Sequence, residues 1–449
     1  MSTIEKHDMT QGKILLPLVS FTIPLVLGNL FQLTYNAADS VIVGKYVGEQ
    51  ALAAVGTSTP IMNIAILLIS GMCMGASVLM SSQYGAKDYD TLSRQISTTM
   101  LAGCGFSVVF SLLMLLLANP VLRLIRVPET AIPEAAAYLR IIFMGLIFTF
   151  MYNFLANTMR ALGDSKTPLY FLVTSAFLNI FGDLFFVVVL CWGVAGSAIA
   201  TVCSEGLCCL LCGIYIKKKI PLLCLGKKWW VFDKSLLGKT VSYGSTSAMQ
   251  QVCLQLGKLI IQSVVNTQGV AVMAAFTAVN RVDDFAYTPQ QNIGHAMTTF
   301  LAQNKGAGHK ERMKKGFQTG LLIELVYSIG LFCVIWGLAP QIMTLFAEDG
   351  DAQVVSLGIS YLHLISWMYI LPGLTNGVQG FFRGIGDLKV TLYSTFMNMF
   401  GRVVAVFVMI RLLQMEFASL AWANMVGWIV MLLFEVPLLV KSMRNGECG

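Results

Sequence analysis

Apolar stretches long enough to cross a bilayer recur along the whole 449-residue chain. A helix needs about 20 apolar residues to span the hydrocarbon core. Residues 96–118, 169–190 and 316–338 each supply such a stretch. Charged residues make up only 12% of the chain, about half of the share that is usual in soluble domains. The sequence therefore predicts an all-α polytopic membrane protein.

The pattern of these stretches predicts twelve transmembrane helices, and an even number places both termini on one side of the membrane. The predicted spans are residues 14–42, 51–82, 96–118, 135–157, 169–190, 194–216, 240–265, 270–300, 316–338, 354–379, 390–412 and 417–440.

The distribution of Lys and Arg predicts which side that is. Most of the 30 Lys and Arg residues fall in segments on the side of the N-terminus, and only Lys45, Arg123, Arg126 and Arg411 lie in the opposite loops. Positively charged loops face the cytoplasm. We therefore predict a multi-pass protein of the inner (plasma) membrane with both termini cytoplasmic. This placement also accounts for the net charge of +7 without a nucleic-acid partner.

Short motifs recur in order in the two halves of the chain. The sequence RALGD at 160–164 matches RGIGD at 383–387, and SQYGA at 82–86 resembles AQNKGA at 302–307. Such repeats are typical of transporters, whose substrate path lies between the repeats. We predict two pseudo-symmetric six-helix lobes. The N-terminal lobe covers residues 1–216, a basic cytoplasmic linker 217–239, and the C-terminal lobe 240–449.

Acidic residues in the predicted spans of the first half need an explanation, because a charge at the bilayer centre costs at least about 2.5 kcal/mol. Asn179 and Asp183 are four residues apart and share one helix face, as do Thr201 and Glu205. The carboxylates of Asp39 and Asp183, the Asn179 amide oxygen and the Thr201 hydroxyl offer only oxygen ligands, which suit a hard cation or a shared proton. We interpret them as a cation-coupling site for Na⁺ or H⁺. The alternative is that the two aspartates sit near helix ends and contact water or backbone.

The second half carries cations at the corresponding positions. An offset of 219 residues places Lys258 opposite Asp39 and Gln251 opposite Gln32, while Arg402 falls opposite Asn179 or Asp183. We expect Asp283 and Asp284 to pair locally with Arg281; the alternative is that they line the cavity. The candidates for lining a substrate cleft are Gln32, Asn36, Gln251, Lys258 and Arg402.

Pro24 predicts a kink in the first helix, since proline removes one backbone hydrogen bond. A hinge and a static kink are both consistent with this residue.

Taken together, the motifs resemble the MATE (multidrug and toxic compound extrusion) family over nearly the whole chain. The segments that carry the resemblance are residues 39–44 (DSVIVG), 53–56 (AAVG), 83–86 (QYGA), 160–164, 179–183 and 193–201 (GVAGSAIAT) in the first half, with 303–307 and 383–387 in the second. The resemblance implies a twelve-helix, two-lobe antiporter with a central cleft that exports organic cations in exchange for Na⁺ or H⁺.

The resemblance also implies specific site residues. In the DinF-like prokaryotic branch the coupling site lies in the first lobe, which implies Asp39, Asn179, Asp183 and Thr201 for H⁺ or Na⁺. The NorM-like branch uses a glutamate in the seventh helix, where this chain has Gln250 and Gln251 instead.

One rival interpretation is a flippase for a lipid-linked precursor, whose anionic cargo would call for several basic residues in the cleft; here the candidates are Lys258, Arg281 and Arg402. A membrane enzyme is disfavoured because the chain lacks motifs such as H-E-x-x-H and G-x-S-x-G. We expect no cofactor apart from the coupling ion. The expected partners are small organic cations and membrane lipids, and the expected state is a monomer.

Overall fold

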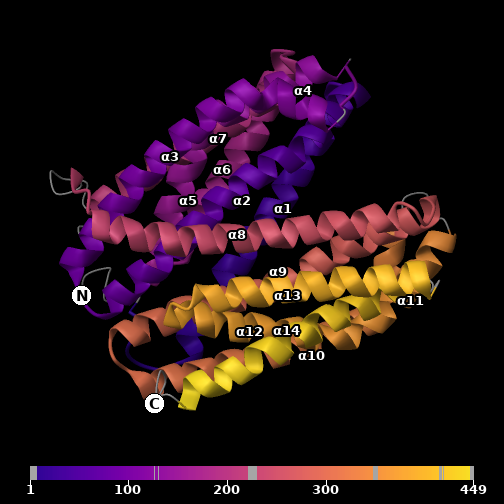
Figure 1. The fold of residues 1–449 in the computed structure, drawn as a ribbon. Helices are drawn as coiled ribbons and strands as arrows, with labels where there is room; N and C mark the ends of the chain where they lie inside the picture. Colours follow the sequence, from indigo (N-terminus) through magenta and orange to yellow (C-terminus); the bar gives the residue numbers. More distant parts are fainter. Residues whose placement is uncertain are drawn as a thin grey trace. The chain divides into compact units, whose positions relative to one another are not determined.

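The computed structural model describes residues 8–125, 127–129, 131–220, 230–346, 352–413, 417 and 419–444; for 36–38, 40, 49–53, 346 and 411–412 it describes the backbone alone. Within these residues the chain is helical and has no β-strand. The first half comprises α1 (Leu15–Tyr46), α2 (Glu49–Gly85), α3 (Tyr89–Leu124), α4 (Ile132–Met144), α5 (Leu146–Ala161), α6 (Lys166–Asp183), the π-helix η2 (Leu184–Val189) and α7 (Gly193–Lys219). The second half comprises α8 (Lys234–Val265), α9 (Val270–Gly306), α10 (Lys310–Phe346), α11 (Ala352–Ser366), the 3₁₀ turn η6 (Trp367–Tyr369), α12 (Ile370–Ile385), α13 (Leu388–Phe407), the π-helix η7 (Val408–Leu412) and α14 (Ser419–Arg444) (Figure 1).

Joining the helices that continue through a bend, a π-helix or a 3₁₀ turn gives twelve helical segments in the described residues, in the order predicted. Nine helices there are long and apolar enough to cross a membrane, and α4 with α5, bent by 46°, forms a tenth candidate. The helices α8 and α9 have the length but carry more polar and charged residues. This polarity indicates that part of their surface faces other groups than lipid.

The chain divides into two compact units. Unit 1 contains residues 1–8 and 23–248, and unit 2 contains residues 9–22 and 249–449. Two helices are therefore divided between the units: α1 between Thr22 and Ile23, and α8 between Ala248 and Met249. In the predicted linker, α7 runs on to Lys219, residues 221–229 lie outside the described part, and α8 begins at Lys234.

Each unit has its own apolar core. In unit 1 the phenylalanines 143, 150 and 154, from α4 and α5, are almost fully buried. In unit 2 the core gathers around Tyr361, Ile365 and Tyr369, against α9, α10 and α14. The helices α9, α10 and α12 pack closely on one another, and so do α13 and α14.

The repeat seen in the sequence is also a repeat of backbone structure. After α5, Asp164 N donates to Met159 O, and after α12, Asp387 N donates to Phe382 O. The residue directly before each aspartate, Gly163 or Gly386, has a φ of 89° or 86°, a left-handed conformation that suits glycine. A π-helix follows both α6 and α13. The two halves thus use the same turn chemistry at matching places.

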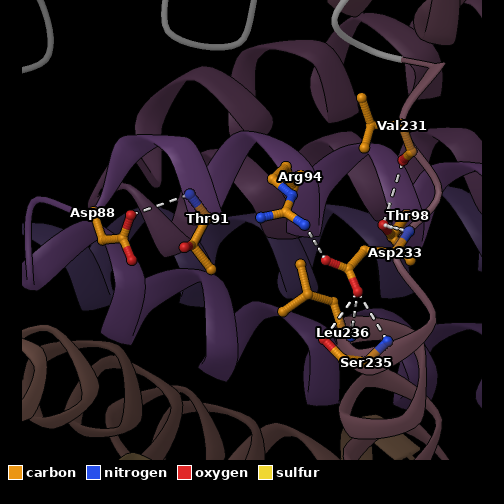
Figure 2. A network of polar contacts seen from close by, with 8 residues as sticks. All are labelled: Asp88, Thr91, Arg94, Thr98, Val231, Asp233, Ser235 and Leu236. Atoms are coloured by element: carbon orange, nitrogen blue, oxygen red, sulfur yellow. Dashed lines mark hydrogen bonds and ion pairs between the residues drawn. The ribbon is translucent and has the colours of Figure 1, made fainter.

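The N-terminus of α8 is fastened to α3 inside unit 1 (Figure 2). Asp233 caps α8 by accepting hydrogen bonds from Ser235, and it forms an ion pair with Arg94 of α3. The Asp233 backbone amide donates to the Thr98 hydroxyl, which in turn lies 3.4 Å from Val231 O. The hydrogen bonds that the Asp233 carboxylate accepts from Ser235, from its hydroxyl foremost, hold the pKa of Asp233 below its usual range, and the nearby Arg94 lowers it further.

The start of the described chain is fastened in a comparable way inside unit 2. The guanidinium of Arg312, on α10, donates to the carbonyl oxygens of Met9, Gln11 and Gly12 at 2.7–3.2 Å. The Met9 amide donates to Gln303 Oε1 at 3.2 Å. The segment that precedes α1 is therefore held by α9 and α10.

Candidate functional site

Two aspartates meet inside unit 1. Asp39 on α1 is half-buried and accepts a hydrogen bond from Ser197 Oγ of α7 at 2.7 Å. Asp183, the last residue of α6, has 0% exposure, and neither of its carboxylate oxygens has a hydrogen-bond partner among the residues that the structure describes. The two carboxyl groups lie within hydrogen-bonding reach of each other if one of them carries a proton. A shared proton or a bound cation would stabilise this pair.

An amide and a hydroxyl complete the set of oxygen ligands. Asn179 Nδ2, one turn before Asp183 on α6, donates to Thr201 Oγ1 of α7 at 3.2 Å. The Thr201 hydroxyl donates to Ser197 O, and Asn179 Oδ1 is buried without a partner. The four residues predicted from the sequence therefore come together in one place, which we call the carboxylate site of unit 1.

Small residues allow α6 and α7 to approach closely at this site. A Cβ built on Gly182 would lie 3.0 Å from Ala200 Cβ, and one on Gly196 would lie 3.0 Å from the backbone of Phe186. Larger side chains there would push α7 away from α6. The π-helix η2 begins directly after Asp183, and such irregular turns are frequent at functional sites.

Ser197 is a member of the site that the sequence reasoning did not single out. It lies one helical turn before Thr201, within the segment 193–201 that carries the family resemblance. Glu205, one turn after Thr201, accepts a hydrogen bond from the Thr149 hydroxyl of α5. The i, i+4 series 197, 201, 205 was the available signal.

A cavity of about 240 Å³ lies within unit 2, among α8, α9, α12, α13 and α14. Lys258 and Arg402, two predicted cleft residues, line it. Lys258 forms a half-exposed ion pair of 3.4 Å with Asp284. The rest of the wall combines amides and hydroxyls such as Asn376, Gln379, Thr375 and Thr395 with Tyr287, Trp428, Met399 and Met431. Such a wall offers both polar groups and an aromatic surface to a ligand.

The expected local pairing of Asp283 and Asp284 with Arg281 is wrong. Asp284 pairs with Lys258, and Asp283 is buried and accepts hydrogen bonds from Tyr369 Oη at 2.6 Å and Tyr361 Oη at 3.3 Å. The donors come from α11 and η6, far along the chain, so the local sequence could not reveal them.

The other predicted residues are placed as follows. Gln32 is exposed on α1 in unit 1, and Gln251 is half-buried on α8 in unit 2, outside the cavity wall. The side chain of Asn36 lies outside the described residues. Pro24 is buried inside α1, two residues after the point where that helix passes from unit 2 to unit 1.

Two buried glutamates went unnoticed in the sequence. Glu324 of α10 and Glu435 of α14 are 1% and 0% exposed, and within the described part of the chain the carboxylate oxygens of both have no hydrogen-bond partner. Each interrupts a predicted apolar span, which was the signal that should have marked them.

Comparison with known proteins places this geometry in context. The MatE family model matches residues 24–185 and again residues 247–409. The "Probable multidrug resistance protein YpnP" of Bacillus subtilis is 32% identical over 392 residues, which cover 87% of this chain and 86% of that protein. The "Probable multidrug resistance protein NorM" of Thermotoga maritima is 23% identical over 423 residues, covering 92% and 89%.

A solved structure has the same fold. A MOP superfamily transporter from Pyrococcus furiosus, described as having a binding pocket of reverse polarity, superposes with a TM-score of 0.91 at 21% identity and covers 99% of both chains.

Proposed function

The chain belongs to the MatE family, and on that premise we propose that it exports organic cations in exchange for H⁺ or Na⁺. As a member, it is a multi-pass membrane protein of the multidrug efflux class, a transporter rather than an enzyme. The observation that supports antiport is the carboxylate site of unit 1. Asp183 is fully buried there without a hydrogen-bond donor, next to Asp39. A bound cation neutralises this pair, and oxygen ligands suit both H⁺ and Na⁺.

The division of α1 between the units supports a link between the ion and the conformation. Arg312 holds the chain just before α1 on unit 2, whereas Asp39 lies in the part of α1 that belongs to unit 1. Pro24 lies between them and leaves the carbonyl of Ser20 without its helical donor. In the proposed cycle, ion binding at Asp39 and Asp183 favours one bend of α1 at Pro24, and the ion's differential affinity for the two states drives export.

The remaining parts of the proposal follow from the sequence. The protein acts as a monomer in the plasma membrane with both termini in the cytoplasm, in contact with lipids, and uses no cofactor or nucleic acid. The unit 2 cavity, with Trp428, Tyr287 and several amides in its wall, supplies a surface for flat organic molecules.

Efflux of a fluorescent organic cation from proteoliposomes tests the proposal. The wild type, Asp183→Asn and the exposed control Asp90→Asn are compared under an imposed Na⁺ gradient and then under a pH gradient. We expect the wild type and Asp90→Asn to export under one gradient, which identifies the coupling ion, and Asp183→Asn to fail.

Absence of efflux from folded wild-type protein under both gradients would contradict the proposal. It would favour the flippase interpretation, in which Lys258 and Arg402 in the unit 2 cavity neutralise an anionic lipid-linked cargo.

A further inference from the structure

A second buried carboxyl group lies in a small polar cradle within unit 2. Glu324 and Ser328 are one turn apart on α10, Gln290 projects from α9, and Gly373 lies on α12. A Cβ built on Gly373 would lie 2.9 Å from Ser328 Oγ, 3.2 Å from Gln290 Nε2 and 3.4 Å from Glu324 Oε2. Three polar groups from two helices thus converge on the side-chain-free face of a third, and any larger residue at 373 would fill this space.

The hydrogen bonds of the cradle leave only acceptors unsatisfied. Gln290 Nε2 donates to Ser328 Oγ at 3.1 Å and to Tyr369 O at 2.8 Å. The Ser328 hydroxyl lies 2.7 Å from the backbone carbonyl of Glu324. Both carboxylate oxygens of Glu324 and the amide oxygen of Gln290 have no donor. Buried acceptors without donors are costly, so a proton or a cation would stabilise the cradle.

Several charged and titratable groups on the helices packed against α10 have partners other than Glu324. On α9, Asp283 accepts from Tyr369 and Asp284 pairs with Lys258; on α11, His363 stacks on Trp336; on α12, Arg383 bonds to Gln379. Tyr327 lies close enough to Glu324 for the two groups to interact electrostatically, but its hydroxyl donates to Ala286 O. Among the described residues, no side-chain cation forms an ion pair with Glu324.

We propose that Glu324, Gln290 and Ser328 form a second cation site, which binds one monovalent cation, H⁺ or Na⁺, against the bare face of Gly373. A carboxylate in an apolar span requires neutralisation, and the two Glu324 oxygens with the Ser328 hydroxyl are ligands for a hard cation. Gln290 contributes by holding the Ser328 hydroxyl in place, because its Nε2 donates to Ser328 Oγ. The proposal extends the proposed antiport, because it adds an ion site in the unit that does not contain Asp183.

Infrared difference spectroscopy of the purified full-length protein tests this site without measuring transport. A neutral carboxyl in an apolar environment has a C=O band that disappears when the group ionises. Asp183→Asn serves as the parent, so that the Asp183 carboxyl group does not contribute, and the double variant Asp183→Asn/Glu324→Gln is compared with it; signals from Asp39 are common to both and cancel. The pH is varied from about 5 to about 9, a range that includes known buried glutamates, first in choline and then in Na⁺.

We expect a buried carboxyl band that titrates in the parent and is lost in the double variant, while the band of the other buried glutamate, Glu435, is common to both proteins. If Na⁺ abolishes the band at constant pH, the site binds both ions; if it does not, the site is selective for protons. The matched control Asp183→Asn/Glu134→Gln, which removes an exposed glutamate, should keep the band. A parent spectrum in which no Glu324 band changes with pH or Na⁺ would overturn the proposal.

Gly373→Ala provides a second variant that keeps the carboxyl group. Its methyl group occupies the cradle, so we expect the titration midpoint to move by about one pH unit, or Na⁺ affinity to fall about tenfold. An unchanged midpoint and affinity in folded Gly373→Ala would show that the ion does not bind in the cradle.

Discussion

Asp183 in unit 1 and Asp283 in unit 2 are both buried aspartates within apolar bundles, yet their surroundings differ in one respect. Asp283 accepts hydrogen bonds from two tyrosine hydroxyls, whereas Asp183 has no donor and faces Asp39. Fixed donors stabilise a buried carboxylate permanently. A carboxylate without them depends on a proton or cation that comes and goes.

This comparison teaches that burial alone does not identify a coupling residue. The decisive quantity is the number of donors that the fold supplies to the carboxylate. By that criterion Asp283 is a structural acid, whereas Asp183 and the buried glutamates Glu324 and Glu435 depend on a proton or cation.

The largest expected effect comes from exchanging each aspartate for asparagine. Asp183→Asn should lower gradient-driven efflux about a hundredfold, the upper part of the usual range for coupling between sites, while the protein remains folded. Asp283→Asn should keep the response to the gradient but unfold at a lower temperature. Initial efflux rates in proteoliposomes, together with thermal unfolding in detergent, measure both. Loss of coupling in Asp283→Asn at unchanged stability would break the distinction.

Removing a donor from Asp283 should cost stability. Tyr369→Phe keeps the ring but deletes the hydroxyl at 2.6 Å, and we expect a loss of about 1–3 kcal/mol in the free energy of unfolding. Tyr361→Phe, which deletes the donor at 3.3 Å, should cost less. Thermal unfolding of both variants measures the difference, and equal stability of wild type and Tyr369→Phe would argue against fixed donors.

Two asparagines sharpen the same contrast. Asn179→Ala removes an oxygen ligand from the carboxylate site of unit 1, so the half-saturating concentration of the coupling ion should rise about fivefold. Asn424→Ala removes the amide that donates to Tyr361 Oη in unit 2, and it should leave ion saturation unchanged. A shift in both variants would indicate a general packing effect instead of ligand loss.

The smallest effect concerns the two fastening points at the surface. The pKa of Asp233 is lowered in the folded state, so its contribution is present above the ordinary aspartate value of about 3.9 and is lost as the pH falls through the lower folded value. Arg312 instead binds backbone carbonyls, which do not titrate in this range. The Leu236 amide donates to Asp233 Oδ1 at 3.3 Å, and the Met9 amide donates to Gln303 Oε1. Hydrogen exchange, corrected for intrinsic rates, should show the Leu236 amide losing protection in acid while the Met9 amide keeps it. Equal acid sensitivity of the two amides would contradict this assignment.

The sequence was sufficient for what local spacing encodes. The i, i+4 pairs on α6 and α7 predicted that Asn179, Asp183 and Thr201 share a site, and the recurring RALGD and RGIGD motifs predicted matching turns. Hydropathy alone would have missed α8 and α9, whose polar residues line the unit 2 cavity or bind within the unit.

What the sequence could not supply were contacts between distant segments. The tyrosines that bond Asp283 lie 78 and 86 residues away from it. Lys258 pairs with Asp284, which lies 26 residues further along the chain on another helix. No sequence periodicity predicts such a contact between helices. Glu324 was visible as a charge in an apolar span, but its cradle depends on Gln290 and Gly373 from two other helices.

The division of α1 between the units has a consequence for the order in which the chain is assembled. Met9 and Arg312, which bind each other in unit 2, are separated by 303 positions. A ribosome therefore completes all of unit 1 before the partner of the leading segment exists. During that time the segment before α1 has no binding partner in unit 2. Its docking on α10 is therefore a late, long-range step that completes the second bundle.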